Sequence, residues 1–243
     1  MTTLVIFARA APTEHTALGF FPEVHVPQGS KIAVITGATA VAAVLVFVYV
    51  AYFLTSTPTT EAAPAAPGGA RLTLQTVASF GHAPDPDWVS YLEQDGRGNW
   101  HHSTIYEVPA HSLVHVTIYQ YDTATGLRNP FWSQVRGTIG GLMTVNGTPL
   151  HALPPDDASH TFAIPDLGVS VPLKGVADKA KNQCSVAPCT QAEAHNTIAF
   201  TFRTGKPGTF RWQCFVPCAA SFVFGNGGPM QTIGWMDGLL KVV

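Results

Sequence analysis

The chain has 243 residues, of which 12% are charged and 46% are hydrophobic, and its formal net charge is −2. A chain with so few basic residues has no electrostatic footprint for nucleic acid, so no nucleic-acid partner is expected. The length accommodates a membrane anchor followed by one sizeable domain.

The first predicted element is a membrane-spanning helix over residues 32–54. This segment contains no charged side chain. At about 1.5 Å per residue, it is long enough for the roughly 30 Å hydrocarbon core of a bilayer. A cleaved signal peptide is the poorer interpretation, because the apolar run is long and begins well inside the chain.

The basic residues around this helix predict its orientation. Arg9 and Lys31 precede the span, whereas the first basic residue after it is Arg71. By the positive-inside rule, residues 1–31 are predicted to be cytoplasmic and the large C-terminal domain extracytoplasmic. The expected location is the cell membrane, with a single pass.

The remainder of the chain has the pattern of a β protein. Residues 55–69 are mostly small residues, prolines and glycines, which predicts a linker. In the domain from residue 70 to 243, short β-rich runs recur between turn residues, without a convincing helical period. The predicted strands are residues 71–77, 104–108, 112–121, 160–164, 197–203, 209–214 and 239–243. Such a series predicts an all-β sandwich.

The four cysteines fall into two close pairs. Outside the membrane, a disulfide that closes the short loop between Cys184 and Cys189 is the favoured interpretation of the first pair. The second pair, Cys214 and Cys218, follows a predicted strand and suggests a soft metal site.

Three segments around the second pair resemble the metal-ligand segments of cytochrome c oxidase subunit II. The first is Asp157-Ala-Ser-His-Thr-Phe-Ala-Ile-Pro-Asp-Leu-Gly168, and the second is Lys206-Pro-Gly-Thr-Phe-Arg-Trp-Gln-Cys214. The third is Gly234-Trp-Met-Asp-Gly238 ahead of the last predicted strand. The resemblance covers the anchor and about residues 104–243, and its specific content lies in 157–168 and 206–243.

The resemblance implies an all-β, cupredoxin-like Greek-key sandwich preceded by one N-terminal transmembrane helix, with copper as the cofactor. Soft sulfur ligands suit copper, and a rigid ligand loop favours fast electron transfer. The implied metal ligands are His160, Cys214, Val216 through its carbonyl, Cys218 and Met236.

One ligand of the family pattern is absent. The family's second histidine follows the second cysteine by four residues, and that position here is Phe222. Copper could be bound by altered ligands, with Met230 or His195 completing the set. Alternatively, the site is lost, and Cys214 and Cys218 form a disulfide in a structural subunit. A third interpretation is a cupredoxin fold used for another purpose, such as metal delivery.

The resemblance implies a component of a membrane respiratory complex of the haem-copper oxidase type. Its partners would be other membrane subunits, with cytochrome c or another protein as electron donor. It would relay electrons through a variant copper site or serve as a structural subunit, and it would catalyse nothing alone. The alternative function is a stand-alone membrane-anchored cupredoxin for electron transfer or copper handling.

Overall fold

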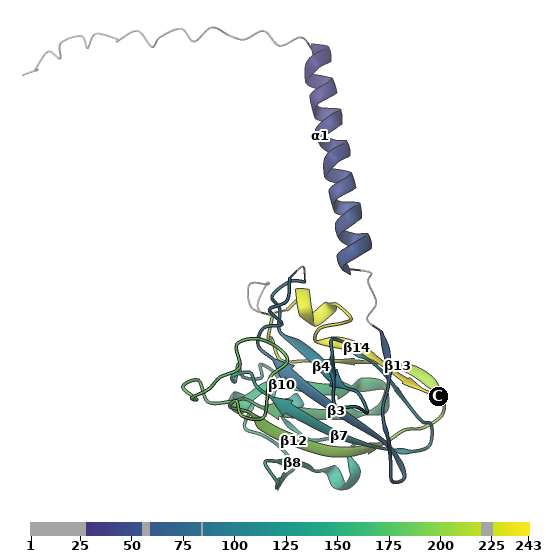
Figure 1. Cartoon of the computed structure of the whole chain (residues 1–243), viewed down its shortest axis with the longest axis vertical. Helices are drawn as coiled ribbons and strands as arrows, with labels where there is room; N and C mark the ends of the chain where they lie inside the picture. Colours follow the sequence, from purple (N-terminus) through teal and green to yellow (C-terminus); the bar gives the residue numbers. More distant parts are fainter. Residues whose placement is uncertain (1–27, 55–58, 84, 220–225) are drawn as a thin grey trace, which may run out of the picture. The chain divides into compact units, whose positions relative to one another are not determined.

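The computed structural model describes residues 28–54, 59–83, 85–219 and 226–243. The chain divides into two units, Met1–Phe53 and Leu54–Val243. The described part of the first unit is an apolar helix, and the described part of the second is built mainly of β-strands joined by turns and short helices (Figure 1).

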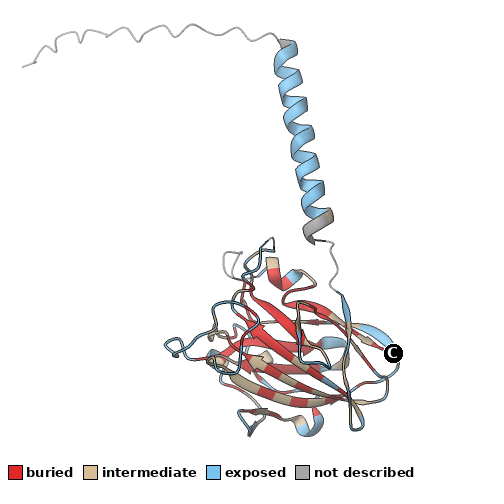
Figure 2. Ribbon diagram, in the orientation of Figure 1, coloured by how far each residue is buried: buried red, intermediate tan, exposed pale blue. Residues whose placement is uncertain are grey.

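Helix α1 spans Gln28–Val48 and continues as a π-helical segment, η1, over Tyr49–Leu54. The stretch Gly29–Ala51 is long and apolar enough to cross a membrane, with a mean hydropathy of 2.4. Its described side chains are exposed apart from the half-buried Ala51 (Figure 2). The helix begins a few residues before the predicted start at residue 32, because Gly29, Ser30 and Lys31 extend its first turn.

The strands form two mixed sheets. The six-stranded sheet contains, in spatial order, β1 (Thr60–Ala62), β6 (Ile105–Val108), β14 (Asp237–Val242), β13 (Gly208–Gln213), β10 (Ala158–Ile164) and β11 (Val169–Lys174). The path of the eight-stranded sheet is β5 (Trp100–His101), β4 (Ser90–Gln94), β3 (Gly69–Val77), β7 (Leu113–Gln120), β12 (Asn196–Arg203), β8 (Met143–Val145) and β9 (Thr148–Leu150), with β2 (Ala65–Ala66) paired to β3. The pairs β1–β6, β6–β14 and β3–β7 are parallel, and the other pairs are antiparallel.

Short 3₁₀ helices connect several strands. They are η2 (Pro130–Ser133), η3 (Ile139–Gly141), η4 (Pro155–Asp157), η5 (Pro165–Leu167) and η7 (Gly228–Gln231). Proline at the start of most of these turns supplies a suitable φ angle and removes an N–H that would have no partner there.

The two sheets share one apolar core. Strand β7 shows why: its residues alternate between buried and half-buried, so that one face contributes Val114, Val116 and Ile118 to the interior. Aromatic rings meet across the core, with the centroids of Tyr91 and Trp212 4.9 Å apart. Figure 2 shows this buried interior in red. Strand β10, which carries a predicted metal ligand, is buried along its whole length.

The structure confirms a mainly β domain preceded by an apolar helix, and each predicted strand has an observed counterpart. The linker assigned to residues 55–69 is too long, because β1, β2 and the start of β3 lie within it. These short strands consist mainly of small residues without large apolar groups, so composition does not reveal them.

Cys184 and Cys189 form the predicted disulfide. Cys189 belongs to a second apolar cluster, and the Cys184 side of the loop packs against it. The buried members of this cluster include Val77, Phe80 and Trp235. The disulfide therefore closes a short loop whose two ends pack against this cluster.

Candidate metal centre

Three of the predicted ligands converge in the interior of the domain. His160 lies on β10, and Cys214 and Cys218 follow β13. The two sulfur atoms are 3.6 Å apart, within hydrogen-bond distance but without a disulfide bond, and the Sγ atom of Cys214 lies 3.9 Å from Nδ1 of His160. The three potential ligand atoms all lie within 4.8 Å of one another. All three residues are buried, so the cluster is shielded from solvent.

Backbone pairing builds this cluster. Strand β13 pairs with β10 near one end and with β14 along its length, which places the end of β13 beside the histidine strand. The N–H of Phe215 donates to Oγ1 of Thr161 at 2.7 Å, next to His160. The cysteine loop is thus attached to two neighbouring strands, which makes the ligand positions rigid.

Of the other two predicted ligands, Val216 lies within the cysteine loop and Met236 contacts it. The carbonyl oxygen of Val216 is 3.7 Å from Sγ of Cys214 and accepts a hydrogen bond from the N–H of Cys218. The carbonyl of Met236 accepts from the N–H of Cys214 at 3.0 Å, which holds this fully buried methionine next to the loop. Met230 is also buried in the same core.

His195 does not join the cluster. Its ring packs against Tyr119 and Tyr121, with centroid distances of 5.8 and 5.2 Å. Its Nδ1 lies 2.8 Å from the carbonyl of Glu193. Phe222, the position at which the family pattern has its second histidine, lies outside the described residues.

The imidazole of His160 lies between a thiol and a carboxylate. Its Nε2 is 3.1 Å from Oδ2 of Asp122, on the side of the ring opposite the cysteines. Burial alone lowers the pKa of His160, but the hydrogen bonds to Asp122 and Cys214, together with their negative charges, raise that pKa to about 9. In the metal-free protein the histidine therefore favours its cationic form.

The two thiols differ in acidity. Burial raises the pKa of Cys214, but hydrogen bonding from Cys218 and His160 and the positive charge of the imidazole hold it well below its usual value. The hydrogen bond to Cys214 and burial raise the pKa of Cys218. The cluster can therefore hold one thiolate without a metal, and binding a cation would release further protons.

The donor set fits a soft metal ion. Thiolate and imidazole ligands suit copper and zinc, and thioethers favour copper. Two sulfurs and a ring nitrogen face one another inside a core that excludes water, and none of the three ligands is a carboxylate. A soft metal ion such as copper or zinc fits these residues, and His160, Cys214 and Cys218 would hold it.

The sequence pattern did not identify Asp122 as part of the site. This aspartate lies two residues after the end of β7 and 38 positions before His160. Only the packing of the loop after β7 against β10 brings the two together. The only indication of its role in the sequence was its position as a polar residue just after β7, a strand whose residues alternate clearly.

A second group of potential ligands, Cys184, Cys189 and Glu193, carries no comparable chemistry because its cysteines form a disulfide. No protein-family model matches the chain, and no curated protein matches it. The functional interpretation therefore depends on the geometry of the cluster formed by His160, Cys214 and Cys218.

Proposed function

We propose that the chain is a membrane-anchored copper protein that relays single electrons within a membrane respiratory complex. In this proposal it resembles subunit II of a haem-copper oxidase, with a cupredoxin-like Greek-key domain. The observation that carries the proposal is the unbonded pair of buried sulfurs, 3.6 Å apart, which faces the ring nitrogen of His160.

The contrast between the two cysteine pairs supports a metal at this site. Cys184 and Cys189 form a disulfide, whereas Cys214 and Cys218 remain thiols within the same domain. In an oxidising compartment, two thiols this close are prone to oxidation to a disulfide. A bound copper ion would keep both sulfurs as ligands and protect them from that reaction.

Copper supplies one-electron redox chemistry when bound, and the protein supplies the surroundings. His160 and the two cysteines would hold the ion, and Met236, whose backbone carbonyl contacts the cysteine loop, would supply a thioether as a weak ligand. The core around them excludes water, and the attachment of the loop to β10 and β14 limits rearrangement between oxidation states. These are the properties of an electron relay, which catalyses no reaction alone.

The disulfide also bears on the location of the domain. Structural disulfides persist on the oxidising side of a membrane. This agrees with the orientation that Arg9 and Lys31 favour, with the β domain outside the cytoplasm. The apolar helix would then anchor the domain beside other subunits and within reach of an electron donor such as cytochrome c.

The test is the metal content and the number of free thiols in the full chain, purified in detergent. We expect copper at one or two ions per chain, two free thiols after its removal, and an intense thiolate-to-copper absorption band. Cys214→Ser should abolish that band and reduce the copper content at least tenfold. A chain without copper and without free thiols would instead contain a second disulfide and would be a structural subunit.

A further inference from the structure

Asp122 is held in place by contacts on both sides of its carboxylate. Its Oδ1 accepts a hydrogen bond of 2.7 Å from the N–H of Thr123, and its Oδ2 faces Nε2 of His160 at 3.1 Å. Its own carbonyl accepts from the N–H of Val176 at 2.9 Å. The residue therefore has little freedom to turn, and one oxygen is committed to the backbone.

This arrangement fixes which ring nitrogen of His160 carries a proton. A carboxylate oxygen can only accept a hydrogen bond, so Nε2 must donate. Metal binding requires the neutral ring, and in that form the proton held on Nε2 leaves Nδ1, which faces Cys214 at 3.9 Å, as the nitrogen that can offer a lone pair. A histidine needs such an oriented nitrogen to bind a metal ion, and a partner on the opposite nitrogen commonly provides the orientation.

We propose that Asp122 is a positioning residue that presents Nδ1 of His160 to the metal. The inference rests on the proposed function, because it concerns the same copper site. It extends that function by assigning a role to a residue outside the ligand set. The side chain of Asp122 is 16% exposed and that of His160 is 0% exposed. The carboxylate therefore lies between the buried imidazole and the solvent.

An asparagine at this position would reverse the hydrogen bond. The N–H of Thr123 requires an acceptor, so the amide oxygen of Asp122→Asn would turn toward it. The amide nitrogen would then donate to Nε2 of His160. The neutral imidazole would keep its proton on Nδ1, directed at Cys214. For a metal ion to bind, this proton would have to leave Nδ1 and the hydrogen bond between the amide and Nε2 would have to be lost.

The test compares Cu(I) affinity in the full chain in detergent, measured by competition with a chromogenic Cu(I) chelator. Loss of such a partner typically lowers metal affinity by about 10- to 100-fold. We expect Asp122→Ala to weaken Cu(I) binding about 10-fold and Asp122→Asn to weaken it about 100-fold. If Asp122 served only to fill space, the isosteric asparagine would be the milder change. The opposite order, or unchanged affinity in both variants, would overturn the proposal.

Asp157→Asn is the matched control. It removes one negative charge from a half-exposed aspartate that pairs with Lys174 at 3.6 Å and does not contact His160. We expect its Cu(I) affinity to equal that of the wild type. An equal loss in this control would assign the effect to net charge and would also overturn the proposal.

Nitrogen-15 NMR of labelled histidine in the metal-free chain separates this inference from the proposed function. At a pH above the His160 pKa of about 9, where the ring is neutral, Nε2 should be protonated in the wild type and unprotonated in Asp122→Asn, whether or not copper binds. An unprotonated Nε2 in the wild type would overturn the inference alone. A wild-type chain that binds no Cu(I) would overturn both the inference and the copper function, and the NMR result would show whether the hydrogen-bond geometry still holds.

Discussion

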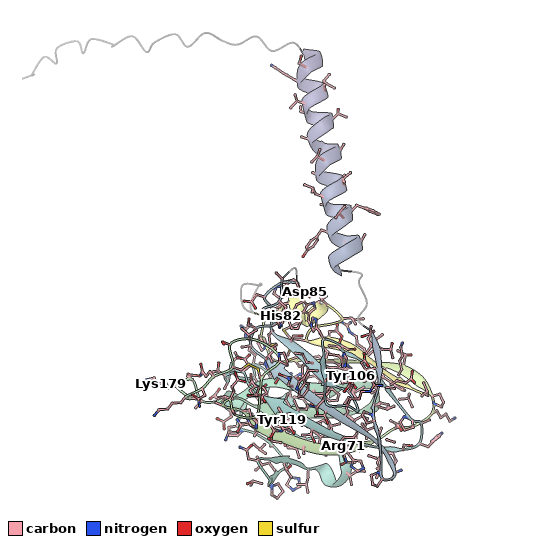
Figure 3. All side chains as sticks on the ribbon, viewed as in Figure 1. Arg71, His82, Asp85, Tyr106, Tyr119 and Lys179 are labelled. Atoms are coloured by element: carbon pink, nitrogen blue, oxygen red, sulfur yellow. A yellow bond between two sulfur atoms is a disulfide. The ribbon has the colours of Figure 1, made fainter. Side chains whose placement is uncertain are left out.

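Glu93 places a carboxyl group inside the β domain. It lies on β4, it is 1% exposed, and its Oε2 has no hydrogen-bond partner in the described structure. Burial, and then the negative charge of Glu61, raise the pKa of Glu93 to about 9. The phenol of Tyr106, labelled in Figure 3, is also buried, and burial and the charge of Glu93 raise its pKa. The core therefore contains an acid that stays neutral at physiological pH.

This acid makes stability depend on pH. In the unfolded chain the carboxyl loses its proton above its ordinary pKa of about 4.3, whereas the folded chain retains the proton until about pH 9. The unfolded state binds fewer protons across this window, so the free energy of unfolding falls as the pH rises. We expect Glu93→Gln to remove the part of this fall that Glu93 causes, leaving the smaller part due to the raised pKa of His160, and to stabilise the fold by about 2 kcal/mol at pH 8.

Denaturant unfolding of the full chain at pH 5 and pH 8 measures this effect. The exposed Asp178 provides a control, because Asp178→Asn also removes an acid but not a buried one. The control should keep the fall in stability between the two pH values. An equally steep fall in Glu93→Gln would show that other groups cause it.

At the scale of single elements, Gly238 on β14 shows how closely the strands approach. A Cβ atom there would collide with the carbonyl oxygen of Thr104 and with the indole of Trp212. That indole donates from Nε1 to the same carbonyl at 3.0 Å, so neither neighbour can move without losing the bond. Glycine is required here for lack of space.

We therefore expect Gly238→Ala to destabilise the domain by about 1–3 kcal/mol, the usual cost of overfilling a packed core. Because Met236 lies two positions earlier, Cu(I) affinity should fall as well. Gly205→Ala is the control, since a Cβ atom at Gly205 meets nothing within 4 Å. Thermal unfolding followed by circular dichroism compares the two. Equal melting temperatures for both variants would contradict the steric explanation.

Local sequence patterns predicted the strands in which apolar and polar residues alternate clearly. Residues 112–121 alternate in this way, and β7 lies within them. Strand β11 escaped prediction because its residues are almost all buried and include Pro172, which removes both the alternation and a backbone donor. In the site, the spacing of Cys214 and Cys218 predicted their proximity.

The rest of the site depends on contacts between distant segments, which spacing does not encode. Asp122 reaches His160 only because the loop after β7 packs against β10. Tyr91 donates from its hydroxyl to the carbonyl of Thr161 at 3.1 Å, beside the histidine, and nothing in its local sequence indicates this role. Tertiary packing determines both contacts.

At the scale of the whole molecule, the orientation of the chain decides which partners the β domain can meet. The helix Gly29–Ala51 has the length and composition for a span, and Cys184–Cys189 is a disulfide. Both agree with an extracytoplasmic domain, because basic residues precede the helix and disulfides persist in oxidising compartments. In that orientation, an electron donor outside the cytoplasm could reach the proposed copper site without crossing the membrane.

This orientation predicts the accessibility of Cys184 and Cys189 in intact cells. In a chain with Cys214→Ser and Cys218→Ser, these two cysteines are the remaining thiols after reduction. We expect a membrane-impermeant reductant to open the disulfide in intact bacterial spheroplasts, and a membrane-impermeant maleimide then to label both thiols. Adding Thr3→Cys to a chain that lacks all four native cysteines gives the control, which should be labelled only after lysis. The reverse pattern would place the domain in the cytoplasm, where glutathione reduces most disulfides, and would remove an extracytoplasmic electron donor as a partner.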